Sequence, residues 1–150
     1  MPQSFACLYT HVVFSTKNRL PLITPEVRPR LYAYMGGIVR SKDSALLAIG
    51  GTDNHVHMLL SLGKNTCISE AIRTIKTNSS KWIHDSLKGL DHFAWQSGYG
   101  AFSVSQSRVQ AVKDYIASQE EHHRKQTFQQ EFIAFLKRHS VAFDERFIWR

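Results

Sequence analysis

The sequence has few cysteines and no long apolar run, and both absences limit the classes of protein to which the chain can belong. Its two cysteines, Cys7 and Cys67, lie in apolar runs and form no CxxC pair, as expected of reduced core thiols in a cytosolic protein. No apolar run approaches the roughly 20 residues needed to span a bilayer. The N-terminus has no basic segment followed by a long apolar stretch, so no signal peptide is indicated. We therefore expect a cytoplasmic protein without a membrane partner.

Acidic residues are scarce relative to basic ones. The 150 residues include 19 Lys and Arg against 12 Asp and Glu, a formal net charge of +7. A basic excess on a compact domain favours a polyanionic partner, either nucleic acid or an anionic membrane surface. The hydrophobic fraction of 43% and the charged fraction of 21% are ordinary for a globular protein. Because repeats and low-complexity tracts are lacking as well, residues 1–150 are predicted to form a single domain.

Strand-like and helix-like segments alternate along the chain. Runs rich in β-branched and aromatic residues predict strands at 5–16, 44–50, 54–62 and 99–104. Apolar residues at helical spacing, together with helix-start signals, predict helices at 25–42, 69–87, 108–125 and 128–138. The order β, α, β, β, α, β followed by helices is that of a ferredoxin-like α+β fold. We expect an antiparallel sheet with helices on one face and a helical addition at the C-terminus.

The pair His55 and His57 is the first feature that indicates chemistry. In a strand, residues i and i+2 point to the same face, so these two imidazoles project side by side while Val56 faces the other way. Their Cα atoms would be about 6–7 Å apart, which allows both rings to bind one metal ion. The alternative is that two polar side chains simply face solvent.

The second feature is Tyr115, which lies on a predicted helix four residues before Gln119. Residues i and i+4 are neighbours on a helix, so both side chains share one side of it. A tyrosine hydroxyl can attack a phosphodiester and form a covalent intermediate, while a metal neutralises the phosphate charge. The alternative is a tyrosine that packs at the boundary between helix and sheet.

Taken together, the two motifs and three longer phrases resemble a known family. His55-Val56-His57 looks like the signature of the HUH endonucleases, and Tyr115 with Gln119 resembles the catalytic helix of the single-tyrosine HUH transposases of small bacterial insertion sequences, which include the REP-associated tyrosine transposases. The phrases at 11–19, 98–105 and 120–125 are similar to the same family. The resemblance covers roughly residues 8–136.

The resemblance implies a fold, a cofactor and a reaction. His55, His57 and Gln119 would bind a divalent ion, Mg or Mn, without any small-molecule cofactor. Tyr115, on the catalytic helix, would attack the phosphate and leave a 5′-phosphotyrosine and a free 3′-hydroxyl. Family members act as homodimers that cut and rejoin single-stranded DNA at ends marked by hairpins, and the tyrosine helix can be donated to the partner's metal site. Asn54 stands where many relatives carry Asp, which bears on the orientation of His55.

We expect mostly structural roles for the remaining histidines. His122 and His123 are adjacent, so on a helix they point about 100° apart, and His123 is the better candidate to lie near the site. Four further histidines lack a partner at a useful spacing, namely His11, His84, His92 and His139.

Basic residues on several predicted elements could contact DNA phosphates, which would give affinity without reading sequence. The candidates are Lys17, Arg19, Arg73, Lys76, Lys81, Arg108, Lys113 and Arg124. For any one of them, the alternative is a solvated helix face.

Three functions fit the sequence. The first is an active, metal-dependent single-strand DNA transposase, cytoplasmic and associated with the nucleoid. The second is a catalytically idle or domesticated protein of the same fold that binds hairpin DNA. The third is an unrelated metal hydrolase, in which Asp53 would supply a carboxylate near His55 and His57.

Overall fold

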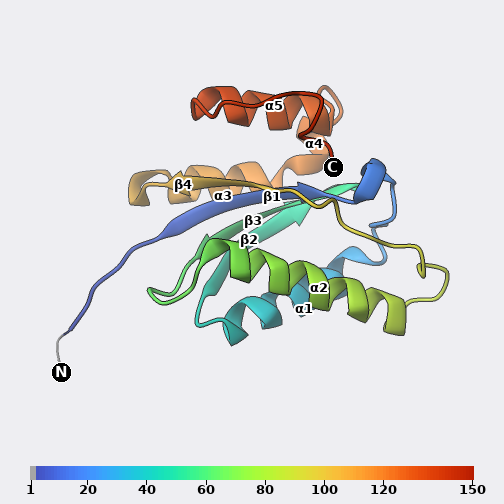
Figure 1. Cartoon of the computed structure of the whole chain (residues 1–150), viewed down its shortest axis with the longest axis horizontal. Helices are drawn as coiled ribbons and strands as arrows, with labels where there is room; N and C mark the ends of the chain where they lie inside the picture. Colours follow the sequence, from blue (N-terminus) through green and yellow to red (C-terminus); the bar gives the residue numbers. More distant parts are fainter. Residues whose placement is uncertain (1–2) are drawn as a thin grey trace.

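A four-stranded antiparallel sheet forms the centre of the computed structural model, which describes residues 3–150 (Figure 1). Its strands are β1 (Tyr9–Ser15), β2 (Ala45–Gly51), β3 (His55–Ser61) and β4 (Gly100–Val104). They are arranged in the order β2-β3-β1-β4, and every neighbouring pair is antiparallel. This is the sheet order of a ferredoxin-like βαββαβ unit, so the predicted α+β fold is confirmed.

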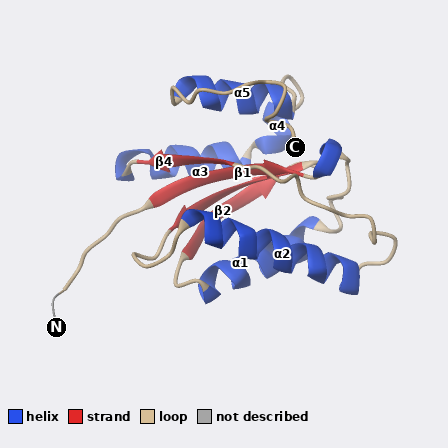
Figure 2. Ribbon diagram, in the orientation of Figure 1, coloured by secondary structure: helices blue, strands red, loops and turns tan. Residues whose placement is uncertain are grey.

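Helices cover both faces of the sheet (Figure 2). One face carries α1 (Arg28–Ser41) and α2 (Ile68–Ser86), as the βαββαβ order requires. The other face carries α3 (Val109–Ala117), α4 (Gln119–His122) and α5 (Phe128–Arg138). Two short 3-10 turns, η1 (Lys17–Arg19) and η2 (Gln106–Arg108), follow β1 and β4.

The two faces of the central strands bury different kinds of side chain. On β3, Val56 and Met58 belong to the apolar core under α1 and α2, whereas His55 and His57 are buried on the opposite face. On β1, Val12 joins the first core and Val13 joins a second cluster, with Phe102, Phe128, Phe132, Phe135 and Leu136. Alternation along a strand therefore separates an apolar layer from a layer that contains polar groups.

The first helix starts later than its sequence signal predicts. Regular helix begins at Arg28 rather than at Pro25, and residues 25–27 form turns. The amides of Val27 and Arg28 both donate to the carbonyl of Thr24. Pro29 explains the delay, because it has no N–H to donate to the carbonyl of residue 25.

The predicted single helix at 108–125 is wrong. Ser118, with φ −107° and ψ 26°, separates α3 from α4, and the chain after His122 forms turns. The Ser118 hydroxyl donates to the carbonyl of Asp114 at 2.9 Å, a local bond that competes with the regular helix. The predicted helix at 128–138 is confirmed, and a capping box between Thr127 and Gln130 fixes its start.

Both cysteines are exposed, so their prediction as core thiols is wrong. Cys7 lies in the extended segment that precedes β1 and projects from the body of the molecule (Figure 1). Cys67 immediately precedes α2. Among the helices of residues 3–150, none combines the length and the apolarity needed to cross a bilayer.

Candidate metal centre and nucleophile

The two histidines of β3 lie at the middle of the sheet, under the C-terminal helices. Their side chains are fully buried, with 0% exposure, and their ring centroids are 5.2 Å apart. His57 is paired with Val13 on β1 and with Gly50 on β2, so strands on both sides hold its backbone. The predicted placement of both imidazoles on one face of one strand is therefore what the structure has.

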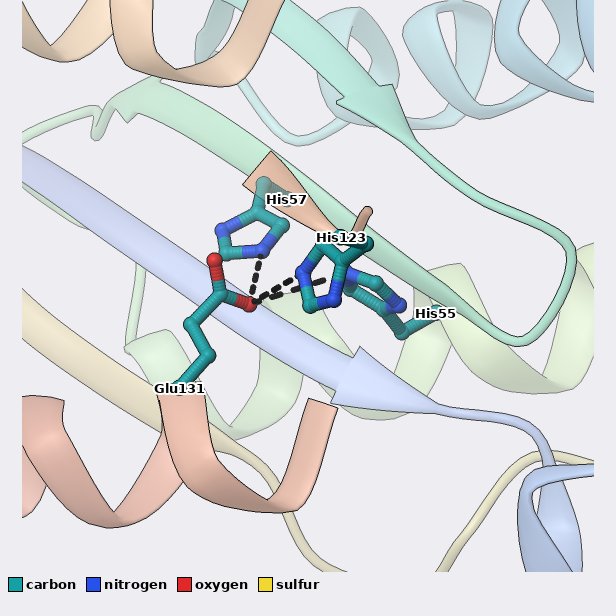
Figure 3. Close-up of side chains that lie close together, drawn as sticks. All are labelled: His55, His57, His123 and Glu131. Atoms are coloured by element: carbon teal, nitrogen blue, oxygen red, sulfur yellow. Dashed lines mark hydrogen bonds and ion pairs between the residues drawn. The ribbon is translucent and has the colours of Figure 1, made fainter. Parts of the chain in front are cut away.

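Two further side chains complete a cluster of four (Figure 3). His123 follows α4 and Glu131 projects from the first half of α5, and one ligand atom from each of the four residues lies within 4.8 Å of the others. Glu131 Oε1 is 2.9 Å from His57 Nε2, 3.1 Å from His123 Nε2 and 3.6 Å from His55 Nε2. Three imidazole nitrogens thus converge on one carboxylate oxygen, the arrangement expected of ligands to a single cation.

Hydrogen bonds on the far side of each ring orient the two strand histidines. His55 Nδ1 is 2.8 Å from Asn54 Oδ1 and 3.0 Å from Thr52 Oγ1. His57 Nδ1 is 2.8 Å from the Nε2 atom of His11, which is buried on β1. With a metal bound, a proton on each Nδ1 would leave both Nε2 lone pairs directed into the cluster. Without one, the Nε2 atom of His57 is the donor to Glu131.

Burial keeps His55 and His11 uncharged, whereas hydrogen bonds keep the Glu131 carboxylate ionised. Desolvation lowers the pKa of His55 to about 3, and His57 adds to the effect. Desolvation, again with His57, lowers the pKa of His11 to about 3. Burial acts to raise the pKa of Glu131, but hydrogen bonds from His123 and His57 outweigh it and hold that pKa well below its usual range. Neutral imidazoles beside an anionic carboxylate are the protonation states that bind a divalent metal.

Tyr115 reaches the same carboxylate from α3. Its hydroxyl donates a hydrogen bond to Glu131 Oε2, while Glu131 Oε1 faces the histidines. Burial and this hydrogen bond raise the pKa of Tyr115, so the phenol is neutral. A pocket of about 100 Å³ adjoins the ring, lined by Gln126, Glu131, Ala134, Phe135 and Arg138. One carboxylate therefore contacts both the candidate metal ligands and the candidate nucleophile.

Gln119 also reaches the cluster, although the helix breaks just before it. Its Oε1 atom lies 3.1 Å from His55 Nε2, and its side chain is buried. Its Nε2 atom donates to the carbonyl of Tyr115 at 3.5 Å, so the two residues stay on one side of the chain.

A glycine on β2 allows α3 to lie directly against the sheet. A β-carbon added at Gly50 would stand 2.3 Å from the backbone oxygen of Ile116, which is closer than any real contact. Because Ile116 follows Tyr115, this close approach sets the depth at which the tyrosine enters the site. The sequence analysis placed Gly50 only at the end of the strand predicted at 44–50, so this role was missed.

A family model described as "Transposase IS200 like" matches residues 4–119 of the chain. The chain belongs to the IS200-like transposase family. The match includes His55, His57, Tyr115 and Gln119 but ends before His123 and Glu131. The second half of the cluster thus lies in a part of this transposase that the family model does not cover.

Two solved structures share the fold of this transposase. A structure described as a candidate transposase from Deinococcus radiodurans has a TM-score of 0.64 at 22% identity, covering 79% of this chain and 98% of the other. A REP-associated tyrosine transposase bound to a REP hairpin has a TM-score of 0.61 at 16% identity, covering 82% and 73%. At such identities the likeness establishes the fold alone. No curated protein matches the chain.

The basic residues predicted to contact DNA lie on several sides of the transposase. Arg108, Lys113 and Arg124 belong to the helical layer that contains Tyr115. Arg73, Lys76 and Lys81 lie on α2, across the sheet from the cluster. Lys17 and Arg19 form part of η1. The eight side chains therefore do not form one patch around the metal centre.

Five of these eight basic side chains have partners within the transposase. Arg19 donates to the carbonyl of Trp149, Arg73 pairs with Glu70, and Arg124 pairs with Glu121. Lys76 Nζ donates to the carbonyls of Gln96 at 2.8 Å and Gly98 at 2.6 Å, and burial lowers its pKa to about 8. Lys81 pairs with Asp85 at 2.7 Å. A role in binding phosphate would require Lys76 in particular to leave these carbonyl partners.

Asp53 does not supply the carboxylate at the cluster. It forms an ion pair with Arg28, which also pairs with Glu120, and it stands outside the group of four ligands. The carboxylate of the cluster comes from Glu131, 74 residues beyond His57.

Sequence reasoning missed Glu131 and His11, and it singled out His123 of the adjacent pair. The missed signal was in α5, whose buried residues Phe128, Glu131, Phe132 and Phe135 recur at helical spacing. A carboxylate within an apolar stripe is seldom buried without a partner. His11 gave no such signal, because its partner is 46 residues away.

Proposed function

We propose that the chain is a metal-dependent transposase that cuts and rejoins single-stranded DNA through a 5′-phosphotyrosine on Tyr115. Membership of the IS200-like transposase family supports the reaction class. The observation that carries the proposal is the hydrogen bond from the Tyr115 hydroxyl to Glu131, whose other carboxylate oxygen adjoins His57 and His123. This contact brings a nucleophile and a set of metal ligands together within one chain.

The donors at the cluster fit a divalent cation. His55 and His57 provide oriented nitrogens, and Glu131 provides an anionic oxygen, with His123 and Gln119 at hydrogen-bond distance from members of this set. Carboxylate and amide oxygens suit both Mg²⁺ and Mn²⁺, whereas several imidazoles favour Mn²⁺ because Mg²⁺ binds nitrogen weakly. When bound, the ion supplies charge neutralisation on the non-bridging phosphate oxygens.

The residues of the chain supply the nucleophile and its proton acceptor. The Tyr115 oxygen forms a bond to phosphorus while the bond from phosphorus to the 3′-oxygen of the neighbouring nucleotide breaks. Glu131 Oε2 is the acceptor placed at the phenolic proton, and the departing 3′-oxygen takes a proton from solvent. The phosphotyrosine retains the energy of the broken phosphodiester, so a 3′-hydroxyl can reverse the step and rejoin strands.

The proposal also includes the DNA substrate and the oligomeric state. The REP-associated transposase of similar fold was solved with a REP hairpin, which supports hairpin-marked single-stranded DNA as the substrate here. A homodimer and a location beside the nucleoid stay predictions. The Tyr115 hydroxyl bonds to Glu131 of the same chain, and donation of the tyrosine helix to a partner's metal site stays a prediction as well.

The decisive experiment is a search for the covalent adduct. Labelled single-stranded oligonucleotides from the flanks of the gene are incubated with the protein and Mn²⁺, or with a chelator, and separated on a denaturing gel. We expect a metal-dependent upshifted band for the wild type and none for Tyr115→Phe. Tyr99→Phe is the matched control, because Tyr99 is exposed beside β4 and lies outside the cluster, and it should form adduct at the wild-type level.

Two outcomes contradict the proposal. Hairpin binding without an adduct from any flanking sequence would favour the idle or domesticated DNA-binding protein. An adduct that persists in Tyr115→Phe would assign the nucleophile to another residue, and cleavage without any adduct would favour a hydrolase that uses water.

A further inference from the structure

A polar cleft opens directly beside the metal ligands. Its volume is about 850 Å³, within the range of roughly 300–1,000 Å³ that is usual for ligand pockets. It lies between the turn that joins β2 to β3 and the segment that joins α4 to α5. Its lining includes Asn54, His123, Arg124, Lys125, Gln126, Gln129 and Gln130.

The cleft is continuous with both halves of the candidate site. His123 lines it and lies 3.1 Å from Glu131. Asn54 lines it and orients His55. Gln126 lines both this cleft and the small pocket beside Tyr115. A DNA strand whose phosphate lies at Tyr115 and the cluster would therefore place an adjoining nucleotide in the cleft.

The wall of the cleft carries side-chain amides whose hydrogen-bonding groups are free. Within residues 3–150, the amides of Gln126 and Gln129 make no hydrogen bond, so both retain a donor and an acceptor for a ligand. By contrast, Gln130 uses its oxygen to accept from the amide of Thr127, and Asn54 uses its oxygen for His55. In a single strand both edges of a base are free to bind such an amide donor and acceptor. Adenine presents a matching donor and acceptor on both edges, N6 with N7 and N6 with N1, whereas each other base presents them on its Watson–Crick edge alone.

Charges at the cleft are arranged for a nucleotide. Arg28 forms ion pairs with both Asp53 and Glu120, the two carboxylates of the lining. Arg124 and Lys125 are exposed along the same wall. Amides within the cleft can bind a base edge, which carries sequence information, while the cations beside it bind phosphate, which carries none.

We propose that this cleft is a base-recognition subsite, in which Gln126 and Gln129 read an adenine next to the scissile phosphate. Arg124 and Lys125 would contact the phosphate of that nucleotide. This inference rests on the proposed function, since it assigns to the transposase a protein contact that selects the cleavage position.

The test is a selection from DNA with randomised bases around the cleavage position. Wild-type protein with Mn²⁺ is allowed to form adducts with the pool, and the trapped strands are sequenced. We expect adenine to be enriched at one position beside the cut. In the double variant Gln126→Ala/Gln129→Ala this enrichment should fall about 5- to 150-fold, while the preferences at other positions stay unchanged. Gln110→Ala, which alters an exposed amide of α3 bonded to Asp114, is the matched control and should select as the wild type does.

A substitution that changes the preference gives a stricter test. Gln129→Glu replaces the amide by a carboxylate, which only accepts hydrogen bonds. Guanine presents two adjacent donors, N1 and N2, on the edge that is free in a single strand, so the enriched base should change from adenine to guanine. Unchanged enrichment in both variants would overturn the subsite, as would a uniform loss of adduct at every sequence. The same pool is also selected by filter binding, which needs no cleavage. An absence of wild-type adduct would contradict the proposed function. The base enrichment among the filter-bound strands, compared between wild type and variants, would still test the subsite.

Discussion

The two faces of the sheet are built from the same strands but meet different requirements. Under α1 and α2, Val56 and Met58 of β3 are packed among apolar side chains. On the opposite face, His55 and His57 of the same strand are equally buried but meet Glu131 and Gln119. The contrast shows that burial alone does not distinguish a core from a site, and that the partners of the buried atoms do.

The energetic consequences of the two faces differ accordingly. An apolar side chain of Met or Leu size contributes about 1.5–3 kcal/mol through its burial, whatever its exact neighbours. A buried polar group contributes only when its hydrogen bonds are made, and loss of a partner costs about 1–3 kcal/mol. The first face should therefore determine stability, and the second should determine metal binding and reactivity.

The largest effects should come from substitutions at His57 and Met58, which are adjacent on β3 and face opposite sides of the sheet. Met58→Ala should lower the free energy of unfolding by about 2–5 kcal/mol through a cavity, with metal binding retained. His57→Ala should abolish metal binding and adduct formation. Denaturant unfolding measures the first effect. In a thermal melt, Mn²⁺ should raise the midpoint for Met58→Ala and not for His57→Ala, and a metal-induced shift in His57→Ala would contradict this division of the strand.

Gly50→Ala should separate the nucleophile from the metal ligands. The added β-carbon forces the backbone at Ile116 away from β2, and a displacement of about 1 Å can reduce a rate about 100-fold. We expect that loss in the rate of adduct formation, with Mn²⁺ affinity changed less than about twofold. Gly37→Ala is the control, because its nearest neighbour would be the Arg40 side chain at 3.8 Å, and it should react normally. Equal losses of affinity and rate would mean that Gly50 supports the whole cluster.

Glu131→Gln should weaken the metal site without removing the side chain. The amide keeps the size of the carboxylate but not its charge, so Mn²⁺ affinity should fall on the order of 10- to 100-fold by isothermal titration calorimetry. The exposed Glu145 provides the control, Glu145→Gln. Unchanged affinity in Glu131→Gln would remove this residue from the set of ligands and leave it only as the partner of Tyr115.

The smallest effect should come from His11, which acts through another residue. His11→Leu removes the acceptor for His57 Nδ1, so Mn²⁺ affinity should fall on the order of tenfold. His11→Gln, which restores an acceptor, should recover part of the loss. If both variants lose the same affinity, His11 serves packing rather than the orientation of His57.

Local sequence patterns were enough to predict the sheet and the shared face of its two central histidines. Alternation along β3 predicted that His55 and His57 share a face, and the order of segments predicted the sheet. Both follow from geometry within a few residues, which a sequence displays directly.

Features that depend on distant or competing contacts were not predictable in the same way. The break at Ser118 arises because its hydroxyl bonds to the carbonyl of Asp114, a choice that helical spacing does not reveal. Glu131 belongs to the site only because α5 folds back over the sheet, and Gly50 matters only because α3 lies on it. Cys7 was misplaced since the first strand begins at Tyr9 rather than at residue 5.

The shared carboxylate makes metal affinity and the state of the tyrosine thermodynamically linked. A Tyr115 that carries phosphate has no hydroxyl proton to donate to Glu131. The carboxylate therefore loses this hydrogen bond in the covalent complex, and its affinity for the metal ion changes. By reciprocity, the factor by which DNA attachment changes affinity for the ion equals the factor by which the ion changes the equilibrium of attachment. A cell's supply of the ion would then set not only how fast strands are cut but how long they remain attached.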